Sequence, residues 1–360
     1  MTIETDSTFA PDPARAKDIL SRELGFGNHF TDRMFTARYD EGRGWHSAKI
    51  GRFEDFQLSP AAAVLHYGQA IFEGQKVYRQ PDGEVAVFRP RMNARRFVRS
   101  ADRLVMPAVP EAFYIEAADR LVDIERAWVP GGEMQSLYMR PFMIATEPLQ
   151  GVRPAKQYLF SIILSPVGAY YASGFNPVRI FVSPDLVRAP KTGVGEAKAA
   201  GNYAASLLAG THAEKAGCSQ VLWLDAAKRK YVEEIGAMNI MFAIDGALVT
   251  PPLGGSILAG VTRDSVLVLA EQQGTKVEER AVAIEELIAA IESGRCTEAF
   301  GCGTAAVITS IGSFLHQGKE YALPSAPGPM AERMLQTITD IQWGRARDPH
   351  AWMHIVPRRA

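Results

Sequence analysis

Hydrophobic residues recur at helical spacing in the first half of the chain. From Pro90 onward, apolar side chains follow intervals of three and four residues, which predicts a helix. The next stretch repeats this spacing and predicts a second helix, through Phe113, Ala117, Leu121, Ile124 and Trp128. We therefore expect two consecutive helices in this region.

Short apolar runs predict strands around these helices. The runs 71–77 and 85–88 flank the turn sequence Pro81-Asp82-Gly83, so they are expected to form a hairpin. The other predicted strands are 136–143, 158–165, 179–183, 220–224, 238–244, 298–300 and 305–310. Further helices are predicted at 204–216, 262–272 and 284–293.

Strands and helices mix in both halves of the chain, which predicts an α/β (α+β) fold in two domains. A run of small and turn residues near the middle, 166–178, is the candidate linker. The expected division is a flexible segment 1–24, a small α/β domain 25–165, this linker, and a large domain 179–360.

The composition is that of an ordinary globular protein, with 360 residues of which 47% are hydrophobic and 22% charged. The net charge of −1 gives no overall field that would favour nucleic acid or an anionic membrane. The three cysteines are too few for a disulfide framework, and no cysteine and histidine cluster points to a metal site. With no signal-like N-terminus and no apolar stretch long enough to span a membrane, we expect a soluble cytoplasmic protein.

Lys198 stands among glycines and alanines, in the stretch from Gly193 to Tyr203. Such short neighbours would let a ligand approach both the backbone and the amine closely. On composition alone, an exposed loop lysine is the simpler interpretation. A phosphate-binding loop would need a spacing of glycines that this stretch lacks.

The segment 301–306 fits a loose Gly-x-Gly-x-x-Ala pattern, with Glu320 at about the distance expected for a ligand of a dinucleotide ribose. This pattern makes a dinucleotide-dependent oxidoreductase the rival class of function. It should open a helix, however, and the β-branched residues of 307–311 predict a strand. A glycine turn between two strands is therefore the preferred interpretation.

Other candidate residues are individually weak. Val261 and Thr262 begin a predicted helix, where free backbone N–H groups bind anions. Arg96 could reach an anion or simply lie on a solvated helix surface. Glu233 and Glu234 lie between two apolar strands, and strand alternation sends their side chains to opposite faces, so only one can enter a buried site. Taken alone, both are best interpreted as surface charges.

Several short motifs occur together in one order along the chain. They are the segment 66–74, Phe88-Arg89-Pro90 followed by Asn93 and Arg96, the segments 137–141 and 166–170, Lys198 with 201–203, Glu234 with Gly236, Met238 and Asn239, the segment 260–263, and Gly303-Thr304-Ala305. This set resembles the branched-chain amino acid aminotransferases, which are fold type IV pyridoxal phosphate enzymes of the D-amino acid aminotransferase-like architecture. The resemblance extends from about Gly25 to Trp352.

The resemblance implies a role for each matching residue around the cofactor. Lys198 would hold pyridoxal 5'-phosphate covalently and then move a proton as the catalytic base. Glu234 would keep the pyridine nitrogen protonated, with Glu233 pointing away, and Tyr203 would bind the phenolate oxygen. The phosphate would lie on Arg96, the backbone of Val261 and Thr262, and Thr304.

For the substrate, the resemblance implies an apolar pocket with carboxylate sites. Tyr138 and the backbone of Thr304 and Ala305 would hold the α-carboxylate. Arg140, with Tyr67 of a neighbouring subunit, would receive the γ-carboxylate of glutamate; a structural role of Arg140 between strands is the alternative. The pocket would be lined by Tyr67, Phe72, Gln150, Val152, Tyr170 and Ala237, the last in place of a threonine common in some members. Tyr67 and the loop 150–152 would come from a neighbouring subunit, which implies a homodimer.

The expected function is reversible amino transfer between leucine, isoleucine or valine and 2-oxoglutarate. A fold relative that acts on D-amino acids or aminodeoxychorismate is the alternative, and the Tyr138-x-Arg140 pair favours the branched-chain interpretation. A dinucleotide oxidoreductase would leave Lys198 and Glu234 without a role.

Overall fold

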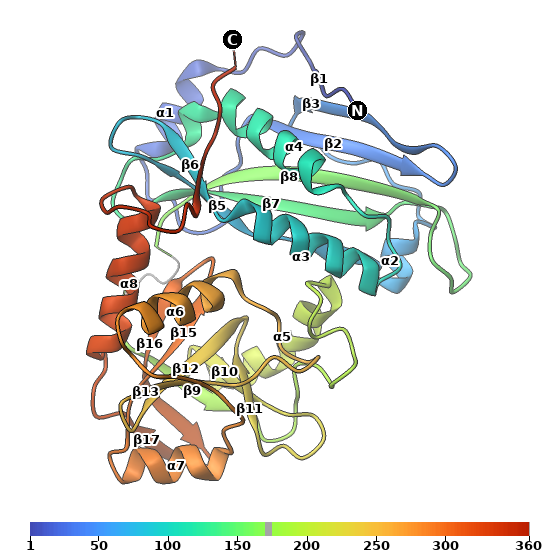
Figure 1. Cartoon of the computed structure of the whole chain (residues 1–360). Helices are drawn as coiled ribbons and strands as arrows, with labels where there is room; N and C mark the ends of the chain where they lie inside the picture. Colours follow the sequence, from blue (N-terminus) through green and yellow to red (C-terminus); the bar gives the residue numbers. More distant parts are fainter. Residues whose placement is uncertain (170–174, 360) are drawn as a thin grey trace. The chain divides into compact units, whose positions relative to one another are not determined.

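The structure is a computed structural model and describes residues 1–169 and 175–359. The chain divides into two compact units (Figure 1). Unit 1 comprises Met1–Ala172, Ala197–Ala200 and Ile341–Ala360, and unit 2 comprises Ser173–Glu196 and Gly201–Asp340.

Unit 1 is built on a mainly antiparallel sheet. Its nine described strands pair in the order β1-β3-β2-β8-β7-β5-β6-β18, with β4 beside β7, and the edge strand β1 runs parallel to β3. Their bounds are β1 (Glu4–Thr5), β2 (Arg33–Asp40), β3 (Gly44–Arg52), β4 (Ala70–Phe72), β5 (Gln75–Arg79), β6 (Val85–Phe88), β7 (Ser136–Ala145), β8 (Gln157–Val167) and β18 (Met353–Ile355).

Two of the helices of unit 1, α3 (Pro90–Arg103) and α4 (Glu111–Ile124), pack against its sheet and form part of its hydrophobic core. The other helices of this unit are α1 (Pro13–Leu20), α2 (Ala63–Tyr67) and the 3-10 helix η1 (Arg126–Trp128). Phe97 of α3 and Tyr114 of α4 meet Phe160 of β8, with ring centroids 5.5 and 6.0 Å apart. The same core takes in Leu137 and Met139 of β7, so the residues that alternate with them lie on the other face of the sheet.

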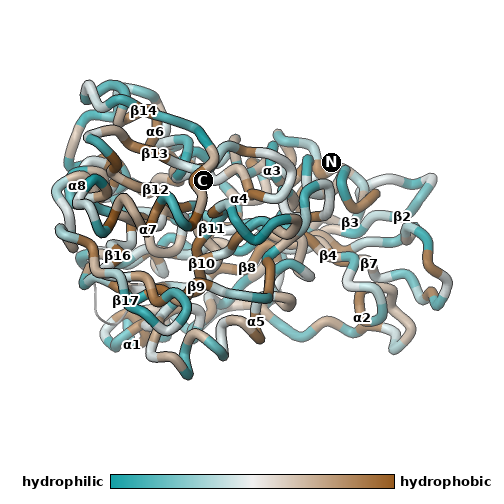
Figure 2. The backbone as a smooth tube through the Cα atoms, turned by 90° about the horizontal axis from the view of Figure 1, so that it is seen from below, coloured by the Kyte–Doolittle hydropathy of each residue, from teal (hydrophilic) through white to brown (hydrophobic). Residues whose placement is uncertain are grey.

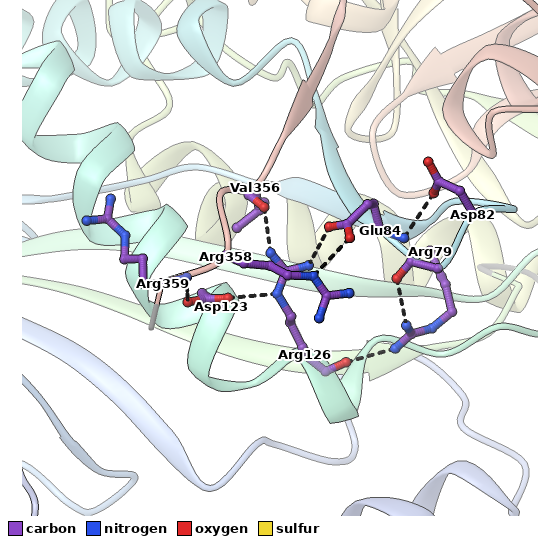
Figure 3. A network of polar contacts seen from close by, with 9 residues as sticks. Arg79, Asp82, Glu84, Asp123, Arg126, Val356, Arg358 and Arg359 are labelled. Atoms are coloured by element: carbon purple, nitrogen blue, oxygen red, sulfur yellow. Dashed lines mark hydrogen bonds and ion pairs between the residues drawn. The ribbon is translucent and has the colours of Figure 1, made fainter.

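The C-terminal tail belongs to unit 1, whereas the expected division placed 179–360 in one domain. β18 pairs antiparallel with β6, and Arg126 donates to the carbonyl of Val356 at 2.5 Å. Arg358 donates to Glu84 at 2.9 Å (Figure 3). Strand pairing and these polar contacts join the end of the chain to the first sheet.

The segment 1–24 also carries ordered structure, where a flexible segment was expected. β1 pairs with β3, and Ile3 beside it is only 4% exposed. Arg33 of β2 donates to the carbonyls of Asp6 and Phe9, at 3.1 and 2.5 Å. The polar composition of this segment predicted flexibility because its few contacts are made with residues distant in the sequence.

Unit 2 is built on a second, mixed sheet. Its nine described strands pair in the order β11-β10-β9-β16-β15-β12-β13-β14, with β17 beside β16. Because β11 also pairs with β12, the strands from β11 through β10, β9, β16 and β15 to β12 form a closed ring. The bounds are β9 (Val178–Val182), β10 (Gln220–Leu224), β11 (Val232–Ile235), β12 (Met238–Ile244), β13 (Ala247–Thr250), β14 (Val277–Glu279), β15 (Cys296–Gly303), β16 (Val307–His316) and β17 (Lys319–Ala322).

The remaining helices are α5 (Ala200–Lys215), α6 (Val261–Gln272), α7 (Ile284–Glu292) and α8 (Pro329–Gln342). Strands of unit 2 carry many of the brown, hydrophobic positions of the chain (Figure 2), and β12 is buried along its whole length. The helices predicted at 204–216, 262–272 and 284–293 are confirmed to within a few residues. In the described part of the chain, no helix combines the length and apolar character that crossing a membrane requires.

Candidate active site

Lys198 lies just before α5, at a point where its backbone is fixed on both sides. Its N–H donates to Ser100 Oγ of α3 at 2.9 Å, and its carbonyl accepts from the N–H of Phe72 at 3.1 Å. Its Nζ lies 4.8 Å from the centre of the Phe72 ring. The side chain is half-buried, so the interpretation as an exposed loop lysine is wrong.

Arg96 is buried on α3 and bound to a carboxylate. Its Nε and Nη2 donate to the two oxygens of Glu73, at 2.7 and 2.8 Å, and Asn93 donates to the same carboxylate at 2.7 Å. Burial raises the pKa of Glu73, but Arg96, Lys198 and Asn93 outweigh it, so the pKa lies below its ordinary value. The interpretation of Arg96 as solvated surface is wrong, because a charged carboxylate holds it in the interior.

Arg140 and Tyr138 lie on the face of β7 that points away from the core of unit 1. Arg140 Nη2 donates to Tyr138 Oη at 3.0 Å, and the guanidinium lies 4.7 Å from the centre of the Phe72 ring. Arg140 Nε is buried and has no hydrogen-bond partner among the residues that the structure describes. A Cβ at Gly74 would overlap Tyr138 Oη, which explains the glycine. Phe72 thus contacts both Arg140 and the amine of Lys198.

The residues expected to reach a neighbouring subunit lie on exposed parts of unit 1. Tyr67 is 41% exposed and donates from its hydroxyl to the carbonyl of Gln150. Val152 is 88% exposed. Tyr170 lies outside the described residues.

Glu234 and Tyr203 line one pocket of unit 2. Glu234 comes from β11 and is 3% exposed, and Tyr203 comes from the first turn of α5. Asn239 Nδ2 donates to Glu234 Oε1 at 3.0 Å. The other lining residues are Arg188, Asn202, Ser206, Gly236, Ala237 and Leu258. Glu234 is therefore a buried anion of this pocket and not a surface charge.

Arg188 forms a buried ion pair with Glu234, from its Nε to Oε2. Its Nη2 donates to the carbonyl of Gly195 at 2.8 Å and to the carbonyl of Ser256. A Cβ at Gly195 would overlap the Ser256 carbonyl oxygen, so only glycine fits there. One glycine of the stretch before Lys198 is therefore explained by the close packing of two loops.

Glu233 is also buried, at 8% exposure, and its interpretation as a surface charge is wrong. Its carboxylate accepts from Ser256 Oγ at 2.5 Å. Burial raises the pKa of Glu233, and the hydrogen bond from Ser256 and the charge of Arg188 offset this only in part. The two neighbouring carboxylates thus have different hydrogen-bond partners, but both are buried, so the expectation that only one of them would enter the interior is wrong.

Among the described residues, no side chain caps the N-terminus of α6. Its N-cap residue is Gly260, where a Cβ would overlap Asn239 Oδ1. Val261 and Thr262 begin the helix and are each 5% exposed. The first backbone N–H groups of α6 are therefore not used by a capping side chain, which suits an anion.

The segment 301–306 forms a hairpin between β15 and β16. Gly301 pairs with Thr309 and Gly303 with Val307, so Thr304 and Ala305 lie in the turn. A strand follows the glycines where a dinucleotide site needs a helix, and Glu320 is paired with Arg179 at 3.1 Å. The oxidoreductase alternative is therefore wrong.

Cys302 lies on β15 just before this turn and is 1% exposed. Burial raises the pKa of its thiol to about 12, which disfavours a reactive thiolate. Among residues 1–169 and 175–359, no three His, Cys, Asp or Glu side chains are grouped to hold a metal ion.

Sequence reasoning missed three residues of these networks. Glu73 stands inside the quoted segment 66–74, but nothing local predicts its pairing with Arg96, 23 residues away. Arg188 and Ser256 belong to none of the motifs and to none of the periodic hydrophobic patterns described above.

Comparisons with known proteins agree with this arrangement. The family described as amino-transferase class IV matches residues 70–314, and the chain belongs to it. The Bacillus subtilis branched-chain-amino-acid transaminase 1 is 48% identical over 344 residues, covering 95% of this chain and 94% of that protein. Within the class, the chain therefore belongs to the branched-chain amino acid aminotransferases.

Solved structures of this group have the same fold. The Escherichia coli branched-chain amino acid aminotransferase is similar with a TM-score of 0.75 and 28% identity, covering 91% of this chain and 99% of that one. The branched-chain amino acid aminotransferase of T.th., complexed with N-(5'-phosphopyridoxyl)-L-glutamate, has a TM-score of 0.70 and 25% identity, covering 89% and 98%.

Proposed function

We propose that the protein transfers amino groups reversibly between leucine, isoleucine or valine and 2-oxoglutarate, with pyridoxal 5'-phosphate as cofactor. Its family membership supports both the reaction and the cofactor. The observation that carries the proposal is the buried Glu234, which lines one pocket with Tyr203 and is held by Arg188 and Asn239. An anion fixed in this way suits the protonated nitrogen of a pyridine ring.

Several further residues suit a phosphorylated pyridine. The uncapped start of α6 offers the N–H groups of Val261 and Thr262 to a phosphate, and Thr304 and Arg96 are the further donors we assign. Tyr203 is assigned to the phenolic oxygen of the ring. When bound, the cofactor supplies an electron-withdrawing ring that makes the Cα proton of the amino acid acidic.

We assign covalent attachment and proton transfer to Lys198. Its backbone is held by hydrogen bonds with Ser100 and Phe72, which limits the positions that the amine can occupy. Once the substrate amine has freed it, Nζ would take the proton from Cα of the amino acid and deliver it to C4′ of the cofactor, and would move the proton the opposite way in the reverse half-reaction.

The face of unit 1 that carries Phe72, Tyr138 and Arg140 suits substrates of two kinds. The Phe72 ring is an apolar wall for leucine, and the Tyr138 hydroxyl is a donor for the α-carboxylate. The γ-carboxylate of glutamate needs a charged partner when it is buried, and we assign this role to the guanidinium of Arg140. Ala237, in the pocket with Glu234, leaves room beside the substrate side chain.

We propose that the working form is a homodimer. Tyr67, Gln150 and Val152 are the residues assigned to the neighbour's pocket, and Tyr67 and Val152 are exposed in the single chain. On α5, the large apolar side chains of Leu207 and Leu208 are 70% and 56% exposed, which favours a protein contact. Hydrophobic positions on α5 are visible in Figure 2.

We also place the protein in the cytoplasm. Cys218, Cys296 and Cys302 are all free, which suits a reducing compartment.

The test is amino transfer by the purified full-length chain. With the cofactor added, leucine as donor and 2-oxoglutarate as acceptor, glutamate and the leucine-derived 2-oxo acid should form in equal amounts. D-Leucine in place of L-leucine is the control for the D-amino acid alternative and should give no product. Failure to form glutamate from L-leucine at saturating cofactor would overturn the proposal.

A further inference from the structure

One face of α3 is polar although it is buried. Asn93, Arg96 and Ser100 follow one another at spacings of three and four residues, so they lie on the same side of the helix. Their exposed fractions are 2%, 4% and 0%. Asn93 and Arg96 both donate to the carboxylate of Glu73. This carboxylate accounts for two of the three buried polar side chains and leaves the role of Ser100 open.

The hydroxyl of Ser100 contacts the backbone of Lys198. Serine is a poorer helix former than alanine, and a hydroxyl that is buried without a hydrogen bond costs free energy. Ser100 Oγ accepts from the N–H of Lys198 at 2.9 Å, and in the described part of the chain this N–H is its hydrogen-bond partner. A serine at this fully buried position therefore serves the contact with Lys198 and not the helix.

The other side of the Lys198 backbone is held by β4. The carbonyl of Lys198 accepts from the N–H of Phe72 at 3.1 Å. The next residue, Ala199, forms an antiparallel bridge with Ile71. Both backbone polar groups of Lys198 are thus held, one by a helix and one by a strand. Because its backbone is fixed, the direction in which its side chain leaves the backbone is fixed as well.

These contacts form a closed ring that contains both Lys198 and Arg96. The ring runs from Lys198 to Ser100, along one turn of α3 to Arg96, through the carboxylate of Glu73 to the neighbouring Phe72, and back to Lys198. All of it lies within unit 1. One turn of an α-helix is a stiff spacer of about 5.4 Å, so the ring fixes the Lys198 backbone relative to the Arg96 side chain.

We propose that Ser100 is a positioning residue for covalent attachment of the cofactor, which places the backbone of Lys198 relative to Arg96. The inference rests on the proposed function, which assigns the phosphate to Arg96 and the attachment to Lys198. In the attachment, Nζ replaces the aldehyde oxygen of the cofactor and one water leaves. With the phosphate bound at one end, the held backbone brings the amine to the aldehyde at the other end. Ser100 acts through Lys198 and is not itself a catalytic residue.

The test separates attachment from binding in Ser100→Ala, which removes the acceptor of the Lys198 N–H. The first measurement mixes the cofactor-free full-length chain with saturating pyridoxal 5'-phosphate and follows the first-order rate of attachment by absorbance. Borohydride-trapped mass on Lys198 confirms the product. The second measurement is the dissociation constant of pyridoxamine 5'-phosphate. This probe has the same ring and phosphate but an amine in place of the aldehyde, so it binds without attachment.

The expected result is a defect in attachment without a defect in binding. Ser100→Ala should attach the cofactor about tenfold more slowly, because the amine is held less well in its reactive position. Its dissociation constant for pyridoxamine 5'-phosphate should stay within about threefold of the wild type, because Glu73 and Asn93 still hold Arg96. Ser161→Ala is the matched control.

Ser161 suits this purpose because it is also 0% exposed, lies in unit 1, and donates from its hydroxyl to the carbonyl of Phe35 at 2.8 Å. Ser161→Ala removes the same atom from an equally buried site outside the ring. Any loss of stability that follows should leave both the attachment rate and the dissociation constant at their wild-type values.

Attachment at the wild-type rate in Ser100→Ala would overturn the proposal. An equal loss in attachment and in binding of pyridoxamine 5'-phosphate would also overturn it, because the whole helix would then have moved. If Ser100→Ala does not fold, Ser100→Cys carries the test, since a thiol fills the space but is a weak acceptor. A wild-type rate in that variant contradicts the proposal equally. Failure of the wild type to bind pyridoxamine 5'-phosphate and to attach the cofactor would instead overturn the proposed function.

Discussion

The carboxylate of Glu73 and the guanidinium of Arg96 form a two-point ion pair in the interior of unit 1, at 2.7 and 2.8 Å. The side chains are 0% and 5% exposed. Both partners lose their hydration, and each stabilises the charge of the other. The pair also fixes the plane and direction of the Arg96 guanidinium, which we assign to the cofactor phosphate.

Glu73→Gln should weaken both the fold and cofactor binding. Removing one charge of a buried pair leaves the other uncompensated, at a cost of about 3–5 kcal/mol in the free energy of unfolding. Cofactor affinity should fall by about tenfold as Arg96 loses its fixed direction. Denaturant unfolding and cofactor titration measure the two effects. Glu111→Gln is the control, because Glu111 pairs with the exposed Arg91 and Arg95, and should cost less than about 1 kcal/mol.

Glu234→Ala should lower turnover much more than Glu233→Ala at saturating cofactor. Loss of Glu234 removes the anion that keeps the ring nitrogen protonated, and the loss of one such electrostatic contact costs on the order of 10² to 10³ in rate. Glu233→Ala should change turnover by less than about tenfold, because it acts on the pocket indirectly. Steady-state turnover of both variants decides this. Equal losses would show that the assignment of the two strand positions is wrong.

Arg140→Met should harm the glutamate half-reaction selectively. Loss of a charged hydrogen bond to the γ-carboxylate costs ~1.5 to 3 kcal/mol, a factor on the order of tenfold to a hundredfold. Leucine, which has no second carboxylate, should be affected much less. Single-turnover absorbance changes with glutamate and with leucine measure the two half-reactions separately. An equal loss of rate with glutamate and with leucine would contradict this prediction. Arg140 would then have only a structural role, through its hydrogen bond to Tyr138.

Glu125, at the C-terminal end of α4, should make the stability of the protein fall as the pH rises. It is 3% exposed, and burial, together with the nearby carboxylate of Asp32, raises its pKa from 4.5 to about 7. The folded chain therefore holds a proton that the unfolded chain has lost between these two values. This contribution to stability is complete below about pH 4.5 and is lost as the pH rises through about 7.

The measurement is the free energy of unfolding of the wild type and of Glu125→Gln at about pH 5 and about pH 8. Gln is neutral at both values, so the wild type should lose on the order of 2–3 kcal/mol relative to the variant between them. Equal pH dependence in the two proteins would mean that Glu125 is ionised in the fold at both values.

The sequence predicted the regular elements with strong periodicity and missed those without it. The spacing of Ala94, Phe97 and Ala101 marks the buried face of α3, and the structure places all three in the core. β2 was not predicted, although Phe35 and Ala37 alternate with polar residues, because charged side chains at both ends weaken the pattern. Short strands such as β1 and β18 depend on distant partners and carry no local signal.

Within the candidate site, Lys198 and Glu234 were assigned from the joint occurrence of several motifs, because the local pattern around each one alone favoured a surface residue. These two assignments remain predictions. Their supporting partners could not be predicted, because Arg188 and Ser256 meet Glu234 and Glu233 only through the fold of unit 2. The same holds for Glu73, whose role follows from its contact with Arg96 and not from its neighbours in sequence.

The central claim is that Lys198 is the residue that binds the cofactor, and borohydride reduction followed by peptide mapping tests it most directly. Reduction fixes a lysine–cofactor link as a stable amine, which adds a defined mass to one peptide. We predict this mass on Lys198 alone. It should persist in Lys191→Ala, which changes an exposed lysine of the same loop, and be lost in Lys198→Ala. A labelled peptide that carries any other lysine, or an equal label in Lys198→Ala, would contradict the account.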